Sequence, residues 1–142
     1  MKRDNQKVSA YFSASIRGRD GDGALFSDMA KNLKKGAAIA AKIKERFGAV
    51  LDLYVPHDHD AVIQILLLKG YITGDQVVEA DCVLLEERDF LISYVPDKYY
   101  SGGMVAERDA AIELGRPRVE FIKPDEIGFI RIQNVISEIL KG

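Results

Sequence analysis

Apolar and polar positions follow two different periods along the chain, and the periods predict strands and helices in turn. Short apolar runs rich in β-branched and aromatic residues predict strands over 8–13, 49–55, 90–95 and 118–122. Between them, apolar residues recur every three or four positions, which predicts helices over 24–47, 57–70, 73–87, 102–114 and 129–140. Gly36 marks an expected weak point in the first helix, and the two helices over 57–87 are expected to cover the sheet.

The run over 90–95 is almost continuously apolar, as in a strand that helices bury on both faces. Alternating strands and helices in a chain of 142 residues predict one α/β domain, a single Rossmann-like (flavodoxin-like) fold with a mainly parallel sheet flanked by helices. Ligands of such sheets bind beyond the carboxyl ends of the strands. Two glycine-rich loops, over 17–23 and 101–103, follow predicted strands and are expected at that edge.

Composition narrows the class of partner. A formal net charge of −2 provides no positive field to hold the chain on nucleic acid or on an anionic membrane. A single cysteine, Cys82, rules out an internal disulfide and favours a reducing compartment. No apolar stretch has the length of a signal peptide or a membrane span, so we expect a cytoplasmic protein with a small-molecule partner.

The loop after the first predicted strand carries the first motif. Tyr11-Phe12-Ser13-Ala14-Ser15-Ile16-Arg17-Gly18 resembles the opening of the nucleoside 2-deoxyribosyltransferase superfamily, most closely its 2'-deoxynucleoside 5'-phosphate N-hydrolase branch, where Tyr-Phe-Cys-Gly-Ser-Ile-Arg-Gly is typical. The second block of that family has an acidic residue on a helix, an Asp that opens a strand, and Ser-x-Gly-x-x-x-Glu entering the next helix. This chain offers residues of those types in the same order: Asp81, Asp89, Ser101, Gly103 and Glu107.

The resemblance implies a catalytic group of Glu107, Asp81 and Tyr11. A carboxylate suits attack on an anomeric carbon, because the oxocarbenium-like transition state favours negative charge opposite the departing base. Asp81 would hold Glu107 or help to protonate the leaving base, and Tyr11 would orient the nucleophile. Ordinary structural roles stay open for all three: a helix-terminus glutamate, a charged helix-face aspartate and a tyrosine packed in the core.

A 5'-phosphate needs several converging donors. The resemblance assigns them to the two loops, and the amides at the start of the second helix add a positive end. The expected phosphate-binding residues are Ser15, Ile16, Arg17, Gly18, Ser101 and Gly103. Arg17 as an ordinary surface arginine is the competing interpretation.

Several positions depart from the family pattern. Ala14 and Val105 replace glycines, and Arg108-Asp109 stands where the family has Leu-Gly. The segment over 123–128 has no serine, so a phosphate contact from a neighbouring subunit does not carry over, although the resemblance still implies a homodimer. His57-Asp58-His59-Asp60 is interpreted as a solvated turn and helix cap rather than a metal site, and a histidine of this segment that faces the substrate stays an alternative. Tyr99, Tyr100 and Phe26 are second-rank candidates for stacking on a base.

The sequence and the resemblance leave three functions open. The first is hydrolysis of the N-glycosidic bond of 2'-deoxynucleoside 5'-monophosphates to free base and 2-deoxyribose 5-phosphate, without metal or organic cofactor. The second is a deoxyribosyltransferase, in which another base attacks the same intermediate. The third is a non-catalytic nucleotide-binding sensor, which the Glu107-Arg108-Asp109 context favours.

Overall fold

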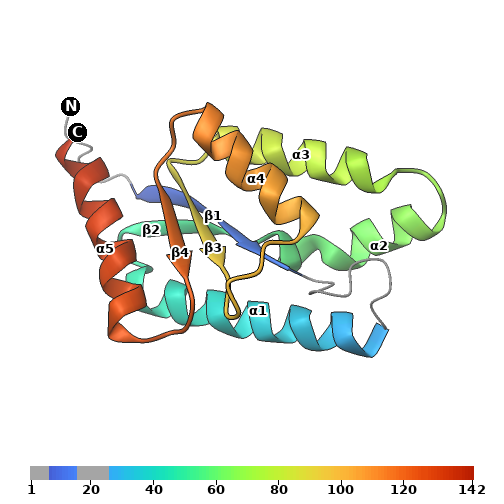
Figure 1. Ribbon diagram of the computed structural model, residues 1–142, viewed down its shortest axis with the longest axis horizontal. Coiled ribbons are helices and arrows are strands. Elements are labelled where there is room, and N and C mark those ends of the chain that lie inside the picture. The colour runs from blue at the N-terminus through green and yellow to red at the C-terminus, as the bar shows by residue number, and fades with distance from the viewer. Residues whose placement is uncertain (1–6, 16–25) are drawn as a thin grey trace.

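The computed structural model describes residues 7–15 and 26–142, without the side chains of Phe26, His57, His59 and Asp60. The described residues form an α/β domain in which every pair of neighbouring strands is parallel (Figure 1). The elements in chain order are β1 (Val8–Ala14), α1 (Phe26–Phe47), β2 (Leu51–Tyr54), the 3-10 turn η2 (Pro56–His59), α2 (Asp60–Leu68), α3 (Gly74–Glu86), β3 (Phe90–Tyr94), α4 (Gly102–Glu113), β4 (Arg118–Phe121) and α5 (Glu126–Lys141).

The strand order β2-β1-β3-β4 confirms the predicted Rossmann-like, flavodoxin-like arrangement. The chain leaves β1 for β2 on one side and then crosses to β3 on the other, so the order reverses between β1 and β3. The register pairs Ser13 with Ser93 and Tyr11 with Leu91 across this junction. A topological switch point of this kind is where open α/β sheets bind their ligands.

The two faces of β1 have different chemistry. Val8, Ala10 and Phe12 belong to the main hydrophobic cluster, to which α1 and α5 contribute Ile39, Ile43, Ile132 and Ile136. The alternate positions Ser9, Tyr11 and Ser13 face the other side of the sheet, where α3 and α4 pack and a smaller cluster contains Leu85 and Ala111. Figure 1 shows α3 and α4 together on one side of the sheet and α1 on the other. One face of β1 is therefore apolar, and the other carries a row of hydroxyl groups.

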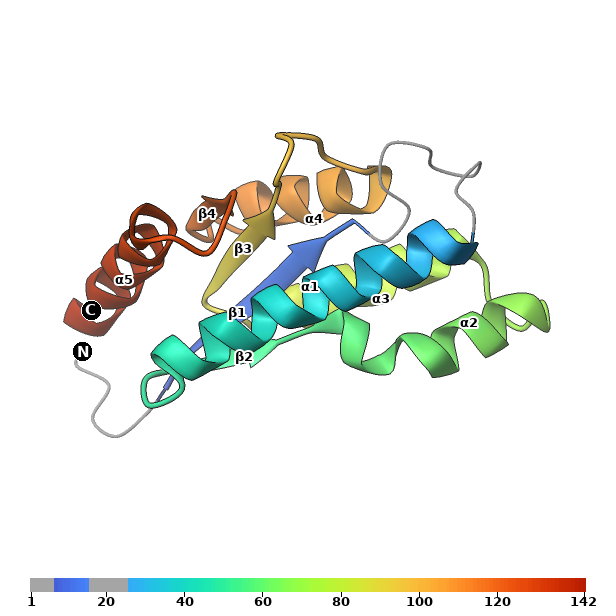
Figure 2. The ribbon, with the colours of Figure 1, turned by 90° about the horizontal axis from the view of Figure 1, so that it is seen from below.

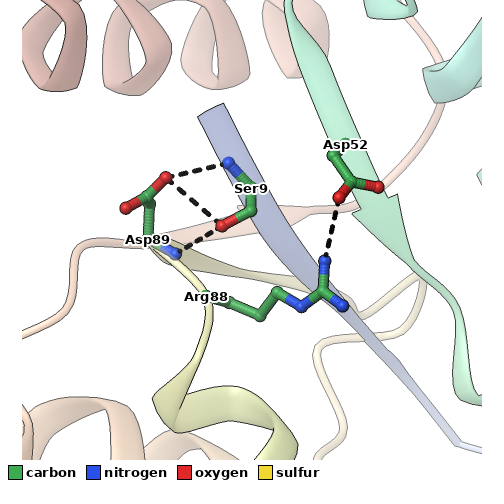
Figure 3. A network of polar contacts seen from close by, with 4 residues as sticks. All are labelled: Ser9, Asp52, Arg88 and Asp89. Carbon is green, nitrogen blue, oxygen red and sulfur yellow. Dashed lines mark hydrogen bonds and ion pairs between the residues drawn. The ribbon is translucent and has the colours of Figure 1, made fainter. Parts of the chain in front are cut away.

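At the amino end of β3, Asp89 anchors the strand to β1. The Ser9 backbone N–H and hydroxyl both donate to Asp89 Oδ2, over 2.9 and 3.2 Å (Figure 3). Beside this pair, Arg88 forms an ion pair with Asp52 over 3.3 Å and stacks on the ring of Tyr54. Asp89 lies at the edge of the sheet opposite the carboxyl ends of the strands, so its role here is to join two strands.

Two expectations about the helices were wrong in detail. The first is that α2 covers the sheet: Figure 2 shows α2 standing away from the strands, and Val62, Ile65 and Leu68 are 61%, 57% and 76% exposed. The second is that the last helix begins at Phe129: α5 begins at Glu126, since the Asp125 side chain caps it by accepting from the Gly128 N–H over 2.9 Å.

Two glycines behave differently in their helices. The predicted weak point at Gly36 does not interrupt α1, in which Gly36 is buried. Gly128 lets α5 approach the sheet, because a Cβ there would lie 2.6 Å from the Phe121 ring.

None of the described helices has both the length and the apolar character required to cross a membrane.

Candidate active site

Glu107 lies on the face of α4 that packs against the sheet. Ser101 caps this helix, with its hydroxyl accepting from the Met104 N–H over 3.4 Å, and the buried positions Met104, Glu107 and Ala111 then recur at helical spacing. Glu107 is 7% exposed, and its Oε1 accepts a hydrogen bond from the hydroxyl of Ser13 over 2.8 Å. Ser13 is itself 1% exposed, so the carboxylate of α4 is fixed to the carboxyl end of β1 inside the protein.

Tyr11 lies two residues before Ser13 and points to the same face of β1. Its hydroxyl is fully buried and makes no hydrogen bond of ordinary geometry. It is nevertheless close enough to act as a donor toward both Glu107 and Asp81 and so to lower the pKa of each. A phenol has one hydrogen to give, so a buried Tyr11 hydroxyl that faces two carboxyl groups without an ideal bond to either is costly in a purely structural role and is typical of a functional site.

Asp81 reaches the same space from α3. It is half-buried, and burial raises the pKa of its carboxyl group, while the Tyr11 hydroxyl acts in the opposite direction. Cys82, the next residue, directs its sulfur toward the carbonyl of Ala106 over 3.9 Å, which places α3 directly beside α4. The structure therefore brings Tyr11, Asp81 and Glu107 together from three different elements.

Burial dominates the electrostatics of this group. Loss of solvation raises the pKa of Glu107 to about 7, the hydroxyls of Tyr11 and Ser13 oppose that rise, and the charge of Asp81 adds to it. The pKa of the Tyr11 phenol is raised well above its ordinary value by burial and then by Glu107 and Asp81. Near neutral pH the site thus holds one carboxyl group poised between its two protonation states and a phenol that stays protonated.

The expected phosphate-binding residues fall into three places. Ser101 and Gly103 lie at the start of α4, where the first backbone amides have no partner within the helix and no acidic residue occupies the first turn. Ser15 follows the end of β1. Ile16, Arg17 and Gly18 lie outside the described residues, so their contribution stays a prediction.

A pocket of about 310 Å³ opens on the other face of the same strand ends. Its lining comes from the end of β1, from α1 and from the loop after β3, and includes Ser15, Asn32, Lys35, Tyr94, Asp97 and Tyr99. Glu107 is not part of this lining. Since Ser13 and Ala14 are consecutive residues of β1, the carboxylate and the pocket lie on opposite sides of one strand end.

The departure at Arg108-Asp109 has a structural explanation. Arg108 stacks on the ring of Tyr100 at 4.9 Å and forms an ion pair with Asp109 over 3.5 Å. The Tyr100 hydroxyl donates to Glu120 over 2.8 Å. Arg108 therefore helps to hold Tyr100, and with it the loop before α4, in place. Tyr99, in contrast, lines the pocket.

Within the part of the chain that the structure describes, no three His, Cys, Asp or Glu side chains gather as metal ligands would. Asp58 of the His57–Asp60 segment is exposed and pairs with Lys44 over 3.5 Å. The side chains of His57, His59 and Asp60 are not among those described, so the reading of this segment as a solvated cap rests on the sequence.

The residues predicted from the sequence do not include Ser13, which binds Glu107, or the pocket-lining residues Asn32 and Lys35. The signal for Ser13 was present, because hydroxyl-bearing residues occupy every second position from Ser9 to Ser13 and so share one face of a strand. Nothing in the sequence distinguishes Asn32 and Lys35 from other polar positions of an amphipathic helix. No family model, curated protein or solved structure matches this chain.

Proposed function

We propose that the protein is an N-glycosidase that hydrolyses 2'-deoxynucleoside 5'-monophosphates to free base and 2-deoxyribose 5-phosphate. The observation that carries the proposal is the convergence of Tyr11, Asp81 and Glu107 at the carboxyl end of β1, beside the switch point of the sheet. Two neighbouring carboxyl groups, one that donates a proton and one that is ionised, are the usual equipment for breaking a glycosidic bond.

In the proposed reaction, Glu107 attacks the anomeric carbon. Its Oε1 is held by Ser13, which leaves Oε2 as the attacking oxygen. The bond from C1' to the base nitrogen breaks as the bond from C1' to Oε2 forms, and the electron pair of the broken bond leaves with the base. The raised pKa of Asp81, which burial causes, suits a group that donates a proton to that base.

Water completes the cycle in the hydrolase. It attacks C1', the ester to Glu107 breaks, and Asp81 takes up the proton that the water loses, so both carboxyl groups return to their initial states. The Tyr11 hydroxyl, which stays protonated, supports the ionised form of Glu107 as a donor. The reaction as proposed requires no metal or organic cofactor.

The start of α4 supports a phosphorylated substrate. The hydroxyl of Ser101 and the amide of Gly103 are donors at the positive end of a helix without a first-turn acid. Ser15 and the predicted loop residues Ile16, Arg17 and Gly18 would complete the phosphate site. A homodimer remains a prediction from the resemblance.

Base exchange and ligand sensing use the same residues and are separated by products. Incubation with each 2'-deoxynucleoside 5'-monophosphate, followed by chromatography, should give free base in water alone. Release that requires an added acceptor base would instead identify a transferase. Glu107→Gln keeps the size of the side chain and removes the nucleophile, so this variant is the control and should release no base. If the unaltered protein binds the nucleotides but releases no base, it is a sensor.

A further inference from the structure

The ring of Tyr11 takes its direction from the side chains that pack against it. Its hydroxyl faces Glu107 and Asp81 without a hydrogen bond of ordinary geometry, so no ideal bond fixes that end of the ring. Parallel pairing places Tyr54 on β2 and Leu91 on β3 directly beside Tyr11, at the same level of the sheet. All three belong to the cluster on the α3 and α4 side, so Tyr54 and Leu91 flank Tyr11 from the two neighbouring strands.

Tyr54 contacts Tyr11 ring against ring. The two ring centroids lie 5.5 Å apart with the planes at 34°, within the range that favours aromatic pairs. Leu91, on the other flank, is fully buried in an inner strand. Tyr54 is half-buried at the end of β2, which is the outermost strand of the described sheet, so its outer side has no neighbouring strand there. The ring of Tyr54 therefore needs a partner from outside the sheet.

Arg88 is that partner. Its guanidinium carbon lies 5.1 Å from the ring centroid of Tyr54, and its Nη1 forms an ion pair with Asp52 over 3.3 Å (Figure 3). Asp52 and Tyr54 are alternate residues of β2, so both lie on the face of the sheet to which Tyr11 points. The Arg88 side chain is only 17% exposed. A planar guanidinium that is paired with a carboxylate and stacked on a ring is suited to hold that ring in one orientation.

We propose that Tyr54, held by Arg88, is a positioning residue: its ring keeps the hydroxyl of Tyr11 directed toward the two carboxyl groups of the site. The catalytic consequence rests on the proposed function. In the proposed reaction the Tyr11 hydroxyl supports the ionised form of Glu107, so a Tyr11 ring that can turn away would leave the nucleophile harder to ionise.

The titration of Glu107 tests this role without relying on turnover. Glutamate is labelled with ¹³C at the δ-carboxyl carbon, and the Glu107 signal is assigned by its absence from Glu107→Gln. Tyr54→Leu should move the titration midpoint of Glu107 to higher pH by about one pH unit, because the hydrogen bond to the charged form is weakened. Tyr54→Phe keeps the ring and should leave the midpoint unchanged.

A second background shows whether the effect passes through Tyr11. Removal of a half-buried ring also changes how water reaches the charged and titratable groups around it, which are Glu107 on α4, Asp81 and Cys82 on α3, Arg88 before β3 and Asp58 in η2. In Tyr11→Phe protein, Tyr54→Leu should no longer move the midpoint, since the hydroxyl that Tyr54 directs is absent. A change in solvation would persist in that background.

Arg88→Met is the second variant, and it carries the test if Tyr54→Leu does not fold. It should move the midpoint of Glu107 in the same direction by a smaller amount, and again only when the Tyr11 hydroxyl is present. A midpoint that either folded variant leaves unmoved would overturn the positioning role. An equal shift in Tyr54→Phe, or a shift that persists in Tyr11→Phe protein, would also overturn it.

Arg46→Met is the matched control for Arg88→Met. Arg46 also pairs with a carboxylate, that of Glu126 over 3.1 Å, and also stacks on a ring, that of Phe129 at 5.0 Å. These contacts join α1 to α5. The control therefore removes the same kinds of contact away from the site and should leave the midpoint of Glu107 unchanged.

Steady-state kinetics separate the positioning role from the proposed function. Tyr54→Leu should lower kcat by no more than Tyr11→Phe does and change KM less than about twofold, because the Tyr11 hydroxyl acts on the reacting carboxylate. Base release that Glu107→Gln abolishes, with a midpoint unmoved by Tyr54→Leu, would reject the positioning role and keep the glycosidase. A midpoint that Tyr54→Leu moves, in a protein that releases no base, would reject the glycosidase and keep the positioning role.

Discussion

Ser13 on β1 donates its hydroxyl hydrogen to Glu107 Oε1 on α4 over 2.8 Å, with both side chains almost completely buried. This bond joins a sheet position to a helix position 94 residues later in the chain. It fixes one oxygen of the carboxylate and stabilises its charged form, which burial otherwise disfavours. Ser13 is therefore a positioning residue for Glu107.

Ser13→Ala should reduce kcat/KM by about 10- to 100-fold, because a hydrogen bond to a charged group contributes roughly 1.5–3 kcal/mol. The acid limb of the pH profile should move to higher pH, since the remaining carboxylate is harder to ionise. Ser13→Thr keeps the hydroxyl and should recover most of the activity. A loss of activity with an unmoved acid limb would mean that Ser13 acts only through packing.

The pH dependence of the reaction should reflect Glu107. Attack requires the ionised carboxylate, and burial raises its pKa to about 7, so kcat/KM should rise through an acid limb near that pH. The reactive form of the pair holds a single proton, and the charge of ionised Asp81 raises the pKa of Glu107; Asp81→Asn should therefore move this limb to lower pH and, because the proton donor is lost, also lower turnover. The two carboxyl groups titrate together, so the limb belongs to the pair. An acid limb that Asp81→Asn does not move would remove Asp81 from the site.

The same ionisation should cost stability. The pKa of Glu107 is higher in the folded protein than its ordinary value of 4.5, so the folded state holds its proton more tightly. Stability from this group is complete below about pH 4.5 and is lost as the pH rises toward 7. A shift from 4.5 to about 7 corresponds to a free-energy cost of about 3 kcal/mol above pH 7.

Glu107→Gln should consequently raise the free energy of unfolding by about 3 kcal/mol at pH 8 and by about 1 kcal/mol at pH 5, measured in urea. Gln keeps an oxygen to accept from Ser13. Glu113→Gln on the exposed face of the same helix is the control and should leave the pH dependence unchanged. A Glu107→Gln protein that is less stable at pH 8 would assign Glu107 a structural role.

Tyr11→Phe separates function from packing in another way. The hydroxyl is buried without a hydrogen bond of ordinary geometry, so its removal should leave the unfolding free energy unchanged within about 1 kcal/mol, or raise it. Turnover should fall by at least about tenfold, because a donor toward ionised Glu107 is lost. A strongly destabilised variant with normal turnover would mean that Tyr11 serves the core.

The sequence contained most of the fold and only part of the site. The alternation of strands and helices predicted the parallel sheet, because apolar periods report which faces are buried. The apolar period could not predict that Ile65 on α2 is exposed, since this period is the same whether or not the helix packs against the sheet. The early start of α5 followed from the Asp125 cap, which the apolar period does not register.

For the site, motif order brought Tyr11, Asp81 and Glu107 to attention, and the structure places them in one cluster. The contact between Ser13 and Glu107 depends on how α4 lies against β1, which local sequence does not encode. The pocket residue Asn32 comes from a helix whose polar positions all look alike in sequence. Tertiary packing therefore determined what the sequence left open.

The proposed reaction requires that Glu107 becomes covalently bound to the sugar, and this can be measured directly. The protein is incubated with a 2'-fluorinated deoxynucleoside 5'-monophosphate, which slows both formation and breakdown of the intermediate, and its peptides are analysed by mass spectrometry. We predict a fluorinated 2-deoxyribosyl 5-phosphate adduct on Glu107, absent from Glu107→Gln. Release of base from natural substrates with no adduct on Glu107, or with the adduct on another residue, would rule out Glu107 as the nucleophile.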